Sequence, residues 1–154
     1  MTDSQFGNGK ILAESLKQEM NQKYEIEIAD VKDAAPETIA EGFPDVLILG
    51  GAIRMFRGDP KSRKWLKKFA SLSENSEKKI KYGTGFLTHA LATDKVQGFA
   101  RRYLNKIKKS TIIESVYPEL LTARVQSQEG PIFPEEMEKA KIFAQNFLKW
   151  IEKQ

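Results

Sequence analysis

The chain contains no cysteine and a single histidine, His89, among its 154 residues. Without cysteine it can form no disulfide, no thiolate-bound zinc site and no cysteine-ligated iron–sulfur cluster. One histidine cannot supply a histidine-rich metal site, so we expect no bound metal. Long apolar runs are also missing, because no window approaches the roughly 18 residues of a membrane span and no signal segment opens the chain. We therefore expect a cytoplasmic protein without a membrane partner.

Charged residues make up 30% of the chain, and hydrophobic residues make up 40%, as in ordinary globular proteins. The length predicts a single domain over residues 1–154. The bases are unevenly placed. Residues 54–68 hold seven bases against Asp59 alone, and residues 95–109 hold six bases and no acid. Such asymmetry bears on the choice of partner rather than on the fold.

Strand and helix patterns alternate along the chain. Residues 24–28 alternate strictly between apolar and polar, which predicts a half-exposed strand at a sheet edge. Residues 46–49 form a continuous apolar run, which is typical of a strand buried on both faces. We place strands at 24–29, 45–50, 79–84 and 111–116, with a broken continuation at 120–125. With helices between them, this order predicts an α/β domain of three layers, doubly wound around a mainly parallel sheet.

A short polar loop with two glycines runs directly into the first helical pattern. Its residues are Ser4-Gln5-Phe6-Gly7-Asn8-Gly9-Lys10. The free amides and the dipole of a helix N-terminus attract anions, and glycine lets a ligand approach the backbone closely. The loop therefore predicts a phosphate site on the amides of residues 6–9. A turn that binds no ligand stays open as the alternative.

Two further loops are expected at the same edge of the sheet, Gly50–Asp59 and Gly83–Ala90. Ligands of doubly wound sheets bind at the carboxyl ends of the strands, where all three loops would lie. The sequence offers no nucleophile–base pair and no carboxylate pair with a recognisable spacing. Any redox chemistry would therefore belong to a cofactor.

The element order and the three loops resemble the flavodoxin family along most of the chain. In the first loop, Ser4, Gly7 and Asn8 match the family's phosphate loop, Ser/Thr-x-Thr-Gly-x-Thr/Ser. Phe6 stands where a hydroxyl is usual, and Gly9 replaces the closing threonine or serine. The missing hydroxyls would weaken phosphate binding, because each hydrogen bond to a charged group contributes roughly 1.5–3 kcal/mol.

The second and third loops extend the resemblance. Residues 50–56 are similar to the Gly-Ser-Pro-Thr-Arg loop of flavodoxin-like quinone reductases, with Gly50 and Arg54 matching. Residues 83–86 resemble the family's second flavin-flanking loop. The resemblance implies FMN as cofactor, held at its phosphate by Ser4, Gln5, Phe6, Gly7, Asn8 and Gly9 and around its ring by Ile53, Arg54, Met55, Phe56, Thr84, Gly85 and Phe86.

The implied function is electron transfer or flavin-dependent redox chemistry, either as an electron carrier or as an FMN-dependent oxidoreductase. The alternative is a flavin-free module that binds proteins through a basic face. In the flavodoxin topology the two basic helical segments lie side by side, which favours an acidic redox or assembly partner. No nucleic-acid-binding module is visible, so nucleic acid is not expected. Homo-oligomerisation is left open.

The resemblance also implies a central strand before the phosphate loop, where only Met1-Thr2-Asp3 stand. Five buried apolar residues would contribute on the order of 10 kcal/mol, as much as the net stability of a typical domain. We expect the N-terminal central strand to be truncated, and we favour a natural chain that begins upstream of Met1. Another segment or a second chain in that slot, or a shift of the edge strand, are the alternatives.

Overall fold

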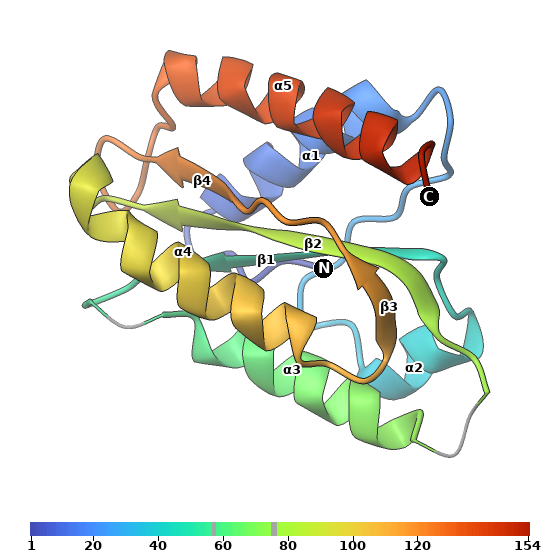
Figure 1. Cartoon of the computed structure of the whole chain (residues 1–154). Coiled ribbons are helices and arrows are strands. Elements are labelled where there is room, and N and C mark those ends of the chain that lie inside the picture. The colour runs from blue at the N-terminus through green and yellow to red at the C-terminus, as the bar shows by residue number, and fades with distance from the viewer. Residues whose placement is uncertain (57, 75–76) are drawn as a thin grey trace.

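The computed structural model describes residues 1–56, 58–74 and 77–154, and it has the expected three layers (Figure 1). One face of the sheet is covered by α1 (Asn8–Met20) and α5 (Pro134–Ile151). The other face is covered by α3 (Pro60–Leu72) and α4 (Thr93–Lys108), and the short α2 (Pro36–Glu41) packs against α3. Within the described ranges, no helix has the length and apolar character needed to cross a bilayer.

The sheet is parallel throughout and is built around β2 (Ile80–His89). On one side β2 pairs with β1 (Val46–Ala52) along the whole length of β1. On the other side it pairs first with β3 (Ile113–Val116) and then with β4 (Leu121–Arg124). The expected continuation after Pro118 is therefore confirmed, since β3 and β4 behave as one interrupted strand.

The strand expected at residues 79–84 is present as β2, but the expectation that it ends at residue 84 is wrong. β2 continues to His89, so Thr84, Gly85 and Phe86 lie inside a strand and are almost fully buried. Gly85 does not form a turn. A Cβ there would come within 2.6 Å of the Leu49 carbonyl oxygen and 2.8 Å of Ile107. The glycine permits close packing, which a sequence pattern cannot distinguish from a turn.

The strand expected at 24–29 is also absent from the described structure. The alternation in burial is present, because Tyr24, Ile26 and Ile28 are half-buried whereas Glu25 and Glu27 are exposed. What is missing is a hydrogen-bonding neighbour, without which an extended segment does not form a strand.

Thr2 holds the place of a truncated central strand. It forms isolated parallel bridges to Asp30 on one side and to Gly50 of β1 on the other. The Thr2 amide donates to Ala29 O at 2.9 Å, and the Gly50 amide donates to Met1 O at 2.7 Å. Residues 1–3 therefore link the segment that ends at Asp30 to the sheet, and the N label of Figure 1 lies beside β1.

Two apolar cores stabilise the layers, one on each face of the sheet. Between α1, α5 and the sheet, Leu12 and Phe147 are fully buried. Between α3, α4 and the sheet, Trp65 stacks on Phe69, with ring centroids 5.2 Å apart. Each pair of helices thus buries apolar side chains against its own face of the sheet.

We predict that the 154-residue chain becomes more stable between pH 6 and pH 8. The Met1 ammonium is buried, donates to Ile48 O at 3.0 Å, and has a pKa lowered to about 6 by loss of hydration, which the carboxylates of Asp30 and Glu27 only partly offset. The unfolded chain, with a terminal pKa near 8, binds more protons over this interval. The free energy of unfolding should therefore rise by about 2 kcal/mol.

Urea denaturation at a series of pH values measures this rise. N-terminal acetylation removes the titrating amine and serves as the control, so the acetylated chain should show a nearly flat profile from pH 6.5 to 8. An equal rise in both chains would contradict the assignment to Met1.

Candidate functional site

A cavity of about 390 Å³, here called the loop cavity, opens where three loops meet at the carboxyl ends of the strands. The first loop precedes α1, the second follows β1 and the third follows β2. Their convergence at this edge is what the order of elements predicts. The lining consists of Asp3, Ser4, Gln5, Phe6, Asn8, Gly9, residues 52–56, residues 88–91, Val125 and Gln128.

The N-terminus of α1 supplies hydrogen-bond donors to one end of this cavity. Gly7 precedes the helix in the left-handed conformation, with φ of 83°, and no side chain caps the helix. The first helical amides therefore lack an intrahelical acceptor. Ser4 Oγ lies next to them, buried and without a hydrogen-bond partner among the described residues. Together, the open amides at the start of α1 and Ser4 Oγ can bind a small anion.

The space around Gly9 explains one departure from the flavodoxin loop. A Cβ at Gly9 would lie 2.6 Å from Thr2 Oγ1, and Thr2 is itself buried. A side chain at position 9 would therefore have to displace the Thr2 hydroxyl. Asn8 is held differently, because its Nδ2 donates to Gln128 O at 3.1 Å and ties α1 to the loop before α5.

The second loop places apolar side chains at the mouth of the cavity. Met55 is 83% exposed and Phe56 is 73% exposed, and both have positive φ angles, 48° and 58°. Phe6 in the first loop is 43% exposed. Large exposed apolar side chains beside a cavity are typical of a ligand site. Ile53, in contrast, is buried and donates its amide to Thr88 O at 2.9 Å.

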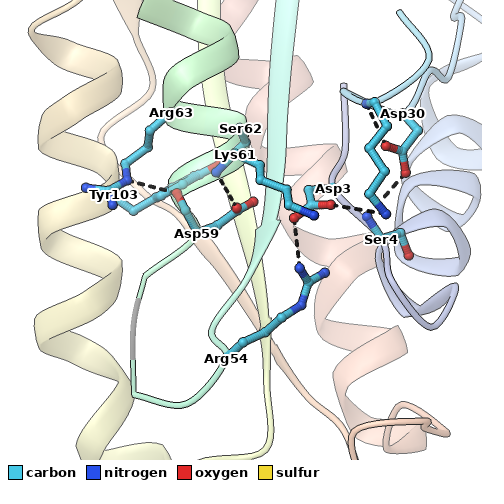
Figure 2. A network of polar contacts seen from close by, with 10 residues as sticks. Asp3, Ser4, Asp30, Arg54, Asp59, Lys61, Ser62, Arg63 and Tyr103 are labelled. Atoms are coloured by element: carbon cyan, nitrogen blue, oxygen red, sulfur yellow. Dashed lines mark hydrogen bonds and ion pairs between the residues drawn. The ribbon is translucent and has the colours of Figure 1, made fainter.

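A polar network lies behind the loop cavity and fixes the N-terminal segment (Figure 2). Asp3 is 1% exposed, and its Oδ2 accepts a hydrogen bond from Arg54 Nη1 at 3.0 Å. Lys32 Nζ forms an ion pair with Asp3 Oδ1 at 3.8 Å. The Ser4 amide donates to Asp30 Oδ2 at 3.3 Å. Arg54, expected to meet a bound anion, is therefore occupied by a carboxylate of the chain itself.

Asp59 connects this network to α3 and α4, the two helices on one face of the sheet. Its Oδ1 accepts from the Lys61 amide at 2.9 Å, so Asp59 is the N-cap of α3. Burial, and next the nearby Asp3 carboxylate, raise the pKa of Asp59. Further into the protein, Ser62 Oγ and Tyr103 Oη lie 2.6 Å apart and join α3 to α4.

His89 ends β2 and lines the loop cavity, although it is buried. Its Nδ1 lies 3.1 Å from Leu91 O. A carbonyl oxygen only accepts, so Nδ1 carries the proton and Nε2 is left as an acceptor in the neutral ring. Burial lowers the pKa of His89, which favours this neutral form.

The structure brings together the residues proposed from the first two loops and separates those of the third. Ten of the expected cofactor contacts belong to the two loops around the cavity, and all of these except Gly7 line it. Thr84, Gly85 and Phe86 do not line it. Residues 88–91 occupy the place expected for the third loop. The continuing apolar pattern Phe86-Leu87 was the signal that the strand runs on to them. No motif in the sequence indicated that Asp3 would line the loop cavity.

Solved structures of flavodoxins share the fold of this chain at low sequence identity. Oxidised flavodoxin 2 of Bacillus cereus matches with a TM-score of 0.70 and 19% identity, over 96% of this chain and 94% of that chain. Oxidised flavodoxin 1 of the same organism gives 0.69 and 21% over the same shares, and two-electron reduced Megasphaera elsdenii flavodoxin gives 0.60 and 14% over 94% and 99%. The chain has the flavodoxin-like fold. No protein-family model and no curated protein sequence matches it.

We predict that Gly9 and Thr2 are energetically coupled. Glycine to alanine in a helix normally stabilises by up to about 1 kcal/mol, but here the new Cβ meets Thr2 Oγ1. Gly9→Ala alone should therefore be neutral or destabilising, whereas Gly9→Ala in a Thr2→Ala background should stabilise. A double-mutant cycle from urea denaturation should give a coupling of about 1 kcal/mol. Additive effects would show that the hydroxyl does not limit this position.

Proposed function

We propose that the chain binds FMN in the loop cavity and takes part in electron transfer or related flavin-dependent redox chemistry. The observation that carries this proposal is the pairing of two unlike ends in one cavity. One end holds open helix amides and an unpartnered hydroxyl, and the other holds exposed apolar side chains. A phosphate joined to a planar aromatic ring matches both ends.

The phosphate would bind to the amides of residues 6–9 and to Ser4 Oγ. Helix N-termini bind phosphate through backbone donors, so the absence of a hydroxyl at Phe6 and Gly9 leaves most of this interaction intact. Ser4 Oγ is buried and has no hydrogen-bond partner in the described part of the chain, and a phosphate oxygen would satisfy it. Arg54 would act indirectly, by pairing with Asp3 and removing a repulsive charge.

The ring would be covered by Met55 and Phe56 on the second loop, with Phe6 at the edge of the first. All three lose exposed apolar surface when a flat ring covers them, which favours binding. Residues 88–91 replace Thr84, Gly85 and Phe86 as the third wall in this proposal. When bound, FMN would supply reversible electron transfer, and these loops would orient the ring and exclude water from it.

We predict measurable FMN binding that depends on both ends of the loop cavity. Quenching of FMN fluorescence should reveal a complex with FMN bound more tightly than riboflavin, which lacks the phosphate. The double variant Met55→Ala, Phe56→Ala should weaken binding about tenfold, or about 1.4 kcal/mol. Ser4→Ala should weaken FMN but not riboflavin.

The control for lost surface apolarity is Ile142→Ala, which removes a side chain that is 59% exposed on α5. It should leave both affinities unchanged. Equal affinities for FMN and riboflavin would contradict the phosphate site, and the absence of any quenching would exclude the cofactor.

We further propose that the basic face formed by α3 and α4 binds an acidic partner protein. The two helices lie side by side on one face of the sheet, joined through Ser62 and Tyr103 (Figure 1). Of the two basic runs, Arg57 lies outside the described residues. Among the described ones, Lys68 pairs with Glu37, and no ion pair engages the exposed side chains of Lys61, Lys64, Lys67, Lys95, Arg101, Arg102, Lys106, Lys108 and Lys109.

This face would serve an electron carrier as a docking surface, and it would also serve a flavin-free interaction module. Like charges gathered on one face raise the association rate with an oppositely charged protein. Binding of FMN separates the two functions, because only the redox function requires it.

We predict that the reversal of Arg63, Lys67, Arg101 and Lys106 to glutamate slows association with an acidic partner at least tenfold. Raising the salt concentration should slow the parent chain and reduce the difference, because exposed charges are screened over about 10 Å at 0.1 M. Surface plasmon resonance measures both effects. The matched control reverses Lys17, Lys79, Lys149 and Lys153, which lie outside α3 and α4. Equal slowing in both variants would show that only net charge matters.

A further inference from the structure

All sulfur in this chain belongs to four methionines, because the sequence contains no cysteine. Met20 is 3% exposed and packs in the core between α1, α5 and the sheet. Met1 and Met137 are half-buried, each packed against one of the two cores. Met55, in contrast, is 83% exposed. Reagents in solution therefore reach the thioether of Met55 far more readily than the other three.

The conformation of the second loop keeps the Met55 side chain outside the core. Arg54, the residue before it, turns back to the protein and donates to Asp3 Oδ2 at 3.0 Å (Figure 2). Met55 and Phe56 then follow in the left-handed conformation, with φ of 48° and 58°. This conformation is uncommon for residues other than glycine, and it clusters at ligand and switch sites. The exposure of Met55 thus belongs to a defined loop geometry at the loop cavity, which Met55 lines.

The thioether of Met55 lies among apolar side chains at the mouth of the loop cavity. Phe56 is 73% exposed and Phe6 is 43% exposed, and both line the same cavity. A thioether is a weakly polar, adaptable group that packs well against aromatic rings. A sulfoxide carries a strongly polar oxygen instead, and such an oxygen loses hydration when a ring covers it. Oxidation of this one sulfur atom would thus make part of an apolar mouth polar.

We propose that Met55 is a site of reversible oxidation by hydrogen peroxide, and that its sulfoxide weakens the binding of a flat aromatic ligand in the loop cavity. In this reaction the Met55 sulfur attacks one peroxide oxygen, so a sulfur–oxygen bond forms and the oxygen–oxygen bond breaks. Sulfur is oxidised by two electrons. The other oxygen leaves as hydroxide and takes the proton of the new sulfur-bound hydroxyl, and the products are the sulfoxide and water. Methionine sulfoxide reductases reverse such an oxidation.

Oxidation of Met55 and its effect on binding rest on different observations. The oxidation rests on the high exposure of Met55 and on the low exposure of the other methionines. The effect on binding rests on the proposed function, because it requires that Met55 covers the ring. An aromatic ring without a phosphate meets Met55 in the same way. Oxidation should therefore weaken FMN and riboflavin by the same factor, whereas Ser4→Ala acts at the phosphate end and should weaken FMN alone.

The first experiment maps the oxidation on the full chain without a ligand. The chain is treated with hydrogen peroxide, and mass spectrometry of its peptides follows the sulfoxide at each methionine. Met55 should react at least about tenfold faster than Met20. It should also react at least about threefold faster than the half-buried Met1 and Met137. In urea, where the chain is unfolded, all four should react at similar rates. Rates of Met1 or Met137 in the folded chain that equal the rate of Met55 would overturn the assignment.

The second experiment measures the quenching of FMN and riboflavin fluorescence before and after treatment with peroxide, which catalase removes before each titration. In the parent chain both affinities should fall about fivefold and return after treatment with methionine sulfoxide reductase. Met55→Leu keeps an apolar side chain that peroxide does not oxidise, so its affinities should be the same before and after treatment. The matched control is Met137→Leu, which should lose affinity upon oxidation as the parent chain does.

These measurements distinguish a failure at Met55 from a failure of the FMN proposal. Unchanged affinities of a parent chain fully oxidised at Met55 would overturn the role of Met55 and leave the FMN proposal standing. An equal loss in peroxide-treated Met55→Leu would also overturn this role, since the loss would then come from another residue. Absence of FMN quenching before any oxidation would overturn the FMN proposal and with it the effect on binding. The peptide map would still decide whether Met55 is the oxidised site.

Discussion

A strand inside a parallel sheet needs hydrogen-bond partners on both edges, and this need governs how β1 is placed. On one side β2 satisfies the whole strand. On the other side the short Met1–Asp3 segment satisfies only the carboxyl half, through Ile48 O and Gly50. The same three residues also hold the 29–31 region, so the position of the sheet edge and the start of the first loop depend on a few backbone hydrogen bonds.

The loop cavity inherits its geometry from this anchoring. Ser4 follows directly on Asp3, and its amide is fixed by Asp30. The first loop therefore leaves the sheet in a defined direction and enters α1, whose amides face the cavity.

Sequence patterns predicted the layers, the helices and the parallel order well, because these depend on periodicity and on alternation. They failed where contacts with residues far away in the sequence decide the local structure. The sequence predicts a loop around Gly85, whereas close contact with Leu49 and Ile107 requires a small residue inside a strand there. The 24–29 segment has the strand pattern and lacks a neighbour. The Asp3–Arg54 pair could not be predicted, since the two residues are 51 positions apart and neither lies in a motif that implies the other.

A buried carboxylate beside a proposed phosphate site raises an electrostatic difficulty that the network resolves. Asp3 alone would repel an anion, because charges interact strongly where water is excluded. Arg54 at 3.0 Å and Lys32 at 3.8 Å bring two positive charges to one negative charge. Asp59, the second buried carboxylate, has a raised pKa and is therefore more easily neutralised than an exposed aspartate. Asp30, whose Oδ2 accepts from the Ser4 amide, is a further carboxylate, so Arg54 and Lys32 balance Asp3 and Asp30, and the attraction for an anion comes from the open α1 amides.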